Sequence, residues 1–249
     1  RIFRRILYIF FTIHLIDSPL NPNYPFVQPL VLGASLPRHD QRRLELLALD
    51  DVHRVQHLFR LRLEGRLDFA ADALRRPGRI REIVTIPSDK PYITLKGLGS
   101  SAAGTVLVDN HSNAGGYGTA GSATVFVYGH DFTAQNLTIS NDYGEGSQAV
   151  AANVSGQRAV FNGVRFLGNQ DTLLVNDGAR AYFVNNYIEG TVDFIFGGGT
   201  AVFNTCSIYE KRTVGGPVTA ARTPATQTYG FLIYKSTITG ATTNTTQLG

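Results

Sequence analysis

The sequence has one cysteine, no methionine, no tryptophan and few charged residues. A single cysteine excludes an intrachain disulfide, and the strand-like run AVFNTCSIY predicts that Cys206 is a small core residue. The histidines and the cysteine show no zinc-binding spacing. Because methionine is absent, the chain has no initiator residue, and we interpret it as a processed chain or a fragment.

The low charge content is unevenly distributed. Charged residues make up 17% of the sequence, whereas 43% are hydrophobic and 26 are glycine, a balance that favours an all-β protein with many turns. Residues 1–81 carry 14 basic and 8 acidic side chains, and residues 82–249 carry 9 and 11. The net charge of +4 therefore belongs to the N-terminal third, and we expect no nucleic-acid partner.

The chain begins with three arginines and an apolar run from Ile6 to Ile16. That run is too short to cross a bilayer, so we expect no membrane anchor there. Its order of basic and apolar residues resembles a secretory signal, and the alternative is a leader without a function.

The composition changes near residue 80. Residues 38–76 are rich in arginine and leucine at roughly helical spacing, which predicts an amphipathic helix broken near Gly65. From Ile83 onward, short β-branched runs alternate with glycine, asparagine and aspartate, which predicts strands and turns. We therefore divide the chain into an Arg/Leu-rich leader, residues 1–77, and a β-domain, residues 78–249.

The β-domain repeats itself. AVFNGVRF starts at Ala159, AYFVNNYI at Ala181 and AVFNTCSI at Ala201, in steps of 22 and 20 residues, and a weaker copy, FTAQNLTI, starts at Phe132. A period of this length without helices predicts a parallel β-helix with about three short strands per coil.

The period brings polar residues together. Asp193 lies in the apolar and aromatic run YIEGTVDFIFGGG, 22 residues after Asp171, and Gln170 follows Gln148 by the same step. Residues one coil apart lie about 4.8 Å from each other in the backbone. Two stacked carboxylates repel, so one of them should have a raised pKa and act as an acid beside an ionised partner. Stacked glutamines can also be a purely structural ladder.

At these residues the sequence resembles the pectin methylesterase (pectinesterase) family. The resemblance rests on SQAVA at 147–151, GNQDTL at 168–173 and GTVDFIFG at 190–197, and extends over roughly Gly78–Gly249. It implies an all-β protein with a right-handed single-stranded parallel β-helix. It also implies an enzyme that removes methyl groups from galacturonate esters in pectin, without a metal or other cofactor.

The resemblance assigns roles by motif. It places the nucleophile at Asp193, the acid/base at Asp171, and the groups that hold the oxyanion at Gln148 and Gln170. Protonated Asp171 would give its proton to the leaving methanol and then activate a water.

Substrate contacts are implied at Thr119, Gln148 and Phe196, and Arg212 is either a contact to galacturonate carboxylates or a solvated surface residue. The expected partner is methyl-esterified homogalacturonan (pectin). We therefore expect a secreted protein of the cell wall that acts as a monomer.

The sequence departs from the family pattern at three places. The early G-x-Y-x-E is GRIRE here, with Ile80 at the tyrosine position. Residues 1–77 do not resemble the family's start. The family continues L-G with R-P-W, whose arginine orients the nucleophile, whereas this sequence stops at Leu248-Gly249, so we expect impaired activity from the chain as given.

Other readings stay open. A calcium-dependent lyase needs a carboxylate cluster and a base, and a polygalacturonase needs several close aspartates and a histidine. We interpret the histidines, which lie far from both aspartate motifs in sequence, as surface or hydrogen-bonded core residues: His14, His39, His53, His57, His111 and His130. The remaining alternative is an inactive fragment or carbohydrate-binding pseudoenzyme of the same fold.

Overall fold

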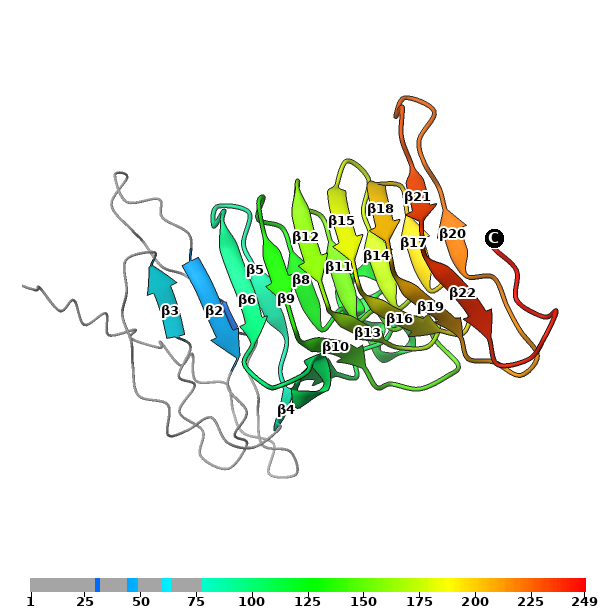
Figure 1. The fold of residues 1–249 in the computed structure, drawn as a ribbon, viewed down its shortest axis with the longest axis horizontal. Coiled ribbons are helices and arrows are strands. Elements are labelled where there is room, and N and C mark those ends of the chain that lie inside the picture. The colour runs from blue at the N-terminus through cyan, green and yellow to red at the C-terminus, as the bar shows by residue number, and fades with distance from the viewer. Residues whose placement is uncertain (1–29, 32–43, 49–59, 64–77) are drawn as a thin grey trace, which may run out of the picture.

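The computed structural model describes residues 78–249 together with three short strands that precede them (Figure 1). Those strands are β1 (Leu30–Val31), β2 (Leu44–Ala48) and β3 (Arg60–Leu63). In the described residues, helical structure is limited to three short turns: η1 (Ala102–Gly104), η2 (Asn113–Tyr117) and η3 (Ala120–Ser122). No helix in this part of the chain is long and apolar enough to span a membrane.

The strands form three sheets, here called A, B and C. Sheet A contains β1 and then β5 (Val84–Ile86), β8 (Val125–Val127), β11 (Ala152–Val154), β14 (Leu173–Val175), β17 (Ile195–Gly197) and β20 (Thr219–Ala221). Sheet B contains β3, β2 and then β6 (Ile93–Gly97), β9 (Thr133–Gln135), β12 (Ala159–Asn162), β15 (Arg180–Val184), β18 (Thr200–Asn204) and β21 (Phe231–Tyr234). Sheet C contains β4 (Gly78–Arg81), β7 (Thr105–Asp109), β10 (Thr138–Asn141), β13 (Arg165–Leu167), β16 (Tyr187–Gly190), β19 (Ser207–Glu210) and β22 (Thr237–Gly240).

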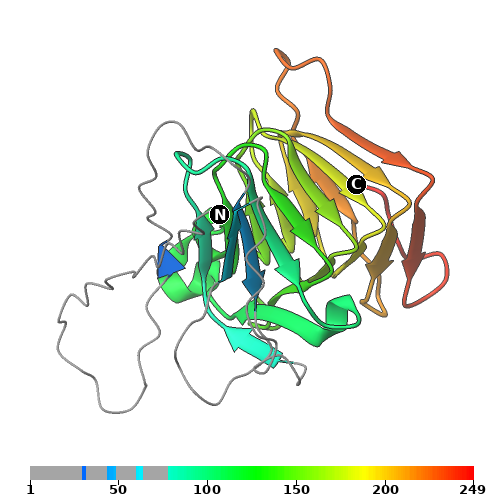
Figure 2. The same cartoon turned by 60° about the vertical axis from the view of Figure 1, so that its left-hand side comes forward.

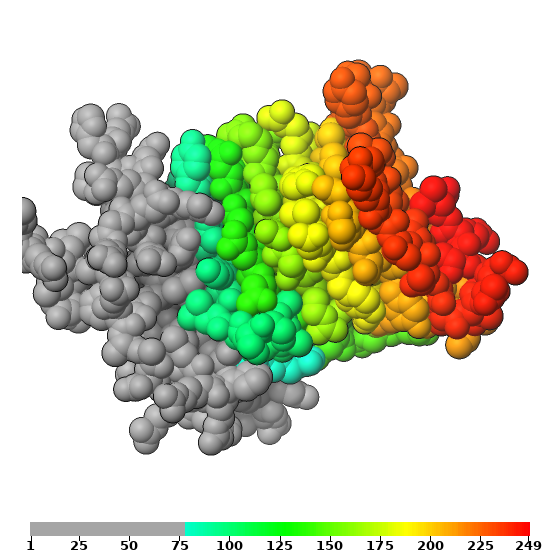
Figure 3. Space-filling model, in the orientation of Figure 1, coloured from blue at the N-terminus to red at the C-terminus, as the bar shows by residue number. Residues whose placement is uncertain are grey.

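Successive coils each add one strand to every sheet, and the chain advances along one axis (Figures 1 and 2). Neighbouring coils pair in parallel, with Ala159 opposite Ala181 and Ala181 opposite Ala201. The weaker repeat copy pairs in the same way, because Thr133 lies opposite Val160. The prediction of a parallel β-helix with three strands per coil is thereby confirmed. In the space-filling view the coils follow one another as successive bands (Figure 3).

A stack of phenylalanines fills the interior behind sheet B. Phe161, Phe183 and Phe203 are fully buried and occupy matching positions on β12, β15 and β18. Their rings are nearly parallel, with centroids 4.9 Å and then 4.7 Å apart. Burial of such rings is a large apolar contribution, and the coil repeat sets their spacing.

The connection from sheet B to sheet C is two residues long in each of five consecutive coils. The first residue of each connection has a left-handed backbone with φ between 48° and 63°: Asn136, Gly163, Asn185, Thr205 and Lys235. Asparagine and glycine adopt this conformation at low cost. A corner of constant length keeps the repeats in register, which is why the pattern is visible in the sequence.

The predicted helix over residues 38–76 is wrong where the structure describes that segment, because β2 and β3 are strands. Strand β2 pairs in parallel with β6 and antiparallel with β3, and β1 pairs in parallel with β5. An open sheet edge presents unpaired backbone groups, and this pairing satisfies them in a way that helical spacing cannot reveal. The rest of residues 38–76, and the signal-like run at residues 6–16, lie outside the described residues.

Candidate active site

Most of the candidate residues lie in the connections from sheet C to sheet A. Gln148 lies between β10 and β11, Gln170 and Asp171 between β13 and β14, and Asp193 between β16 and β17. Because these connections stack coil on coil, they form one continuous strip beside the start of the strands of sheet A.

The two aspartates lie directly opposite each other on adjacent coils. The Asp171 backbone N–H donates to the Val192 carbonyl (3.2 Å), and two residues later Leu173 lies opposite Ile195. Both observations correspond to the step of 22 residues that stacks Asp171 on Asp193. Each aspartate has a left-handed backbone, with φ of 66° and 50°, which asparagine and aspartate tolerate better than most other residues.

Two glycines of the motif GTVDFIFG allow the chain to pass close to its neighbours around Asp193. A Cβ atom at Gly190 would overlap the side chain of Phe194, and one at Gly197 would overlap the carbonyl oxygen of Val175. Gly197 also has a positive φ of 115°. Both positions require glycine for a steric reason, and they hold Asp193 at the surface between two buried stretches.

The electrostatics of the pair are unequal. Asp171 is only 8% exposed, whereas Asp193 is half-buried. Burial first, and then the negative charge of Asp193, raise the pKa of Asp171 to about 7. The sequence-based prediction that one carboxyl group of the pair has a raised pKa is thereby confirmed. No hydrogen-bond donor among the described residues opposes this shift.

The glutamines also stack, and a bulge follows them. The Ala149 N–H donates to the Gln170 carbonyl (3.1 Å), a bond that places Gln148 opposite Gln170. The Thr172 carbonyl then accepts from both Ala151 (2.8 Å) and Ala152 (3.3 Å). This extra residue shortens the step from 22 to 21, so that Ala152 lies opposite Leu173. The bulge lets the polar strip and the core below it keep different registers.

Asn113 orients the amide of Gln148, and the sequence gave no signal for it. The Asn113 Nδ2 donates to Gln148 Oε1 at 3.1 Å, and the Asn113 backbone N–H donates to the Gln148 carbonyl at 2.9 Å. Because Gln148 Oε1 is engaged, its Nε2 group is free to donate elsewhere. Asn113 lies 35 residues before Gln148 in a connection of different length, so the repeat does not relate the two.

The three remaining predicted residues differ in position. Phe196 points outward from β17 and packs, with Phe126, against a small cluster of outward apolar side chains: Ala123, Val150 and Leu174. Thr119 is half-buried at the start of η3, where its carbonyl accepts from Ser122, and no contact links its side chain to the aspartates. Arg212 lines a different surface hollow, with Glu145 and Lys211.

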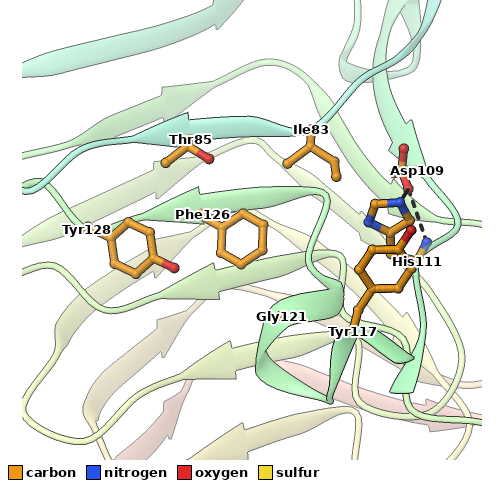
Figure 4. A pocket seen from close by; sticks show the side chains of 8 residues that line it. All are labelled: Ile83, Thr85, Asp109, His111, Tyr117, Gly121, Phe126 and Tyr128. Atoms are coloured by element: carbon orange, nitrogen blue, oxygen red, sulfur yellow. Dashed lines mark hydrogen bonds and ion pairs between the residues drawn. The ribbon is translucent and has the colours of Figure 1, made fainter. Parts of the chain in front are cut away.

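A pocket lies farther along the same face (Figure 4). Its volume is about 490 Å³, and it is lined by Ile83, Thr85, Asp109, His111, Tyr117, Gly121, Phe126 and Tyr128. The interpretation of all histidines as surface or hydrogen-bonded core residues is wrong for His111, because its Nδ1 is buried without a hydrogen-bond partner among the described residues. Distance from the motifs in sequence misled the prediction, because stacking brings the pocket and Gln148 to one face.

No group of three or more His, Cys, Asp or Glu side chains with the arrangement of a metal site occurs among the described residues. The carboxylate cluster that a calcium-dependent lyase requires is therefore not found in this part of the chain.

Comparison with known proteins identifies the family. Residues 74–248 match the family model described as Pectinesterase, so the chain belongs to the pectinesterase family. A pectinesterase from Ralstonia solanacearum is 39% identical over 210 residues, which cover 69% of this chain and 52% of that protein. Pectinesterase 31 from Arabidopsis thaliana is 40% identical over 176 residues, covering 66% and 54%. The chain thus spans about half the length of the curated relatives it matches.

Solved structures agree with this assignment. Pectin methylesterase PemA from Erwinia chrysanthemi superposes with a TM-score of 0.63 at 34% identity, covering 70% of this chain and 59% of that one. The pectin methylesterase from carrot gives a TM-score of 0.64 at 35% identity, covering 70% and 57%. A further similar structure is a pectin methylesterase in complex with a hexasaccharide, with a TM-score of 0.63 at 35% identity.

Proposed function

We propose that this protein is a pectin methylesterase that hydrolyses methyl esters of galacturonate units in pectin and releases methanol. Family membership supports the reaction class. The observation that carries the proposal is the stacked pair of aspartates, in which Asp171 has a pKa near 7 and lies opposite Asp193. A protonated acid beside an ionised carboxylate is the arrangement that ester hydrolysis by covalent catalysis needs.

In the first half of the reaction, a carboxylate oxygen of Asp193 attacks the ester carbonyl carbon. The tetrahedral oxyanion accepts hydrogen bonds from the Nε2 groups of Gln148 and Gln170, and removal of one such donor typically costs about 3–4 kcal/mol. The bond from carbon to the methoxy oxygen then breaks, and Asp171 gives that oxygen its proton. Methanol leaves, and an anhydride joins Asp193 to the galacturonyl group.

In the second half, the roles of Asp171 reverse. Its carboxylate takes a proton from water, and the water oxygen attacks the galacturonyl carbonyl carbon. The anhydride bond breaks, Asp193 leaves as a carboxylate, and Asp171 is protonated again. The net change is ester plus water to acid plus methanol. Because the first half requires protonated Asp171, kcat/KM should fall as pH rises through about 7.

We further propose that the protein acts as a monomer outside the cell, on pectin of the cell wall. The candidate residues come from one chain and lie on one face of the β-helix. The stacked connections make an extended strip, a shape that fits a polymer better than a small ester.

The test is methanol release from methyl-esterified pectin, measured together with chain length. The expected result is methanol without chain scission in the full chain, and background methanol in Asp193→Asn, since an amide cannot act as the nucleophile. Asn tolerates the left-handed backbone at this position, so the variant should fold. Unsaturated chain ends would instead identify a lyase, and binding of pectin without methanol from the unmutated chain would favour the pseudoenzyme alternative.

A further inference from the structure

The pocket in Figure 4 is built from two aromatic pairs that come from different elements. Phe126 and Tyr128 project outward from β8 and its end, with ring centroids 6.0 Å apart and an interplanar angle of 17°. His111 and Tyr117, from the connection between β7 and β8, stack with centroids 3.6 Å apart and an angle of 11°. Tyr117 and Tyr128 are 51% and 42% exposed, so their rings are available to a ligand.

The pocket is continuous with the candidate active site. Phe126 lines the pocket and also packs, with Phe196, on the outward apolar cluster beside the aspartates. Pocket strand β8 and strand β14, which follows Asp171, are separated by two strand spacings in sheet A. At about 4.8 Å per spacing, the pocket lies roughly 10–14 Å from the stacked aspartates along the coil axis, more than the length of one sugar ring.

The charges around the pocket disfavour an anionic ligand. No Lys or Arg is found among the described residues that line it, and the lining carboxylate is Asp109, which accepts from the backbone N–H groups of Asn110 (2.7 Å) and His111 (3.1 Å). His111 Nε2 faces the same carboxylate at 3.6 Å. The nearby Arg81 is engaged by Asp142 at 2.6 Å and 3.0 Å. A free uronate here would meet Asp109 without a cation to pair with it.

We propose that this pocket is a specificity subsite that binds a methyl-esterified uronate ring of the polymer, two or three strand spacings from the ester being hydrolysed. The identity of the polymer rests on the proposed function. The apolar C–H face of the sugar and its ester methyl group pack on Tyr117, Phe126 and Tyr128, and a ring hydroxyl reaches the polar edge formed by Asp109 and His111. The subsite therefore selects stretches of the polymer that are still esterified.

The experiment measures binding rather than turnover, in full-length chain carrying Asp193→Asn to prevent hydrolysis. Three probes are titrated: a fully methyl-esterified galacturonate hexamer, the unesterified hexamer, and a methyl-esterified dimer too short to reach the pocket. Tyr117→Ala and Tyr128→Ala should each weaken binding of the esterified hexamer by roughly 3–10-fold and leave the dimer unchanged. Tyr182→Ala, an exposed tyrosine on sheet B, is the matched control and should change neither.

Asp109→Asn sharpens the test, because asparagine keeps the oxygen that accepts the two backbone N–H groups but removes the charge. It should raise affinity for the unesterified hexamer several-fold and leave the esterified hexamer unchanged. The proposal is overturned if the tyrosine variants bind like the Tyr182 control, if they weaken dimer and hexamer equally, or if a neutral cello-hexaose binds as tightly as the esterified hexamer. A chain that releases no methanol but shows the predicted binding pattern would refute the esterase proposal alone.

Discussion

Two columns of stacked residues use the same repeat, and they have opposite energetic signs. Phe161, Phe183 and Phe203 stack inside sheet B, fully buried and nearly parallel. Asp171 and Asp193 stack at the start of sheet A, where burial and mutual repulsion raise the pKa of Asp171 to about 7. The first column stabilises the coils, and the second costs stability at neutral pH.

The comparison shows that stacking itself is neutral. A β-helix places like residues beside each other, and the chemistry of the side chain decides whether the neighbour is an advantage. A column that opposes folding persists only where the surrounding structure fixes it, which is typical of functional sites. The phenylalanine column and the repeated corners supply that rigidity here.

Breaking the stabilising column should have the largest effect on folding. Phe183→Ala removes a ring that is fully buried between two others, and we expect the free energy of unfolding to fall by about 3–5 kcal/mol. Urea unfolding followed by circular dichroism measures this change. Tyr182→Ala, at the adjacent position but 38% exposed, is the control and should cost less than about 1 kcal/mol. Equal losses in the two variants would contradict the role of the inner column.

Relieving the opposing column should raise stability and lower activity together. The unfolded chain loses the Asp171 proton near pH 3.8, whereas the folded chain keeps it to about pH 7. Stability of the unmutated protein therefore falls as pH rises between these two values, and Asp171→Asn removes that loss. The stability gain of the variant should grow from pH 4 to 7 and reach at most about 4 kcal/mol, at about 1.4 kcal/mol per pKa unit.

The same Asp171→Asn variant should release methanol roughly 10²–10⁴-fold more slowly if proton transfer is its main task. Denaturant unfolding at several pH values, paired with methanol assays, tests both effects in one preparation. A stability gain that does not depend on pH would show that the aspartate is destabilising for a reason other than its charge.

The smallest expected change concerns the orientation of one amide. Asn113→Asp replaces the donor to Gln148 Oε1 by an acceptor, so the Gln148 amide should turn and present its oxygen, instead of Nε2, to the oxyanion. We expect kcat to fall roughly 10–100-fold with little change in KM, since the lost hydrogen bond forms only in the transition state. Asn110→Asp adds the same charge in the same connection and should leave kcat nearly unchanged. Equal losses would indicate a charge effect instead.

The sequence predicted the fold of the β-domain because its coils repeat at nearly constant length around the two-residue corners. Asp171 over Asp193 followed from the same arithmetic, since their coils share one register. The leader was misjudged because β2 is a strand through pairing with β6, a long-range contact that spacing within residues 38–76 does not report.

The parts of the site that sequence reasoning missed share one physical cause. Asn113, His111 and Tyr117 lie in the connection between β7 and β8, which is longer than its counterparts before β14 and β17 and does not repeat. Their positions depend on how that connection folds over the neighbouring coils, through contacts such as the one from Asn113 to Gln148. Periodicity carries no information about such contacts.

The two-residue corner between sheets B and C has a consequence for how such a protein can diversify. Coil steps in this chain vary, with Phe203 following Phe183 by 20 residues and Ile233 following Phe203 by 30, yet these corners keep the same length. Insertions are therefore confined to the other two corners of each coil. The connections from sheet C to sheet A, which carry the candidate catalytic residues, are among those free to lengthen. Evolution can thus revise what the groove recognises by lengthening loops while the scaffold inherits an unchanged pitch.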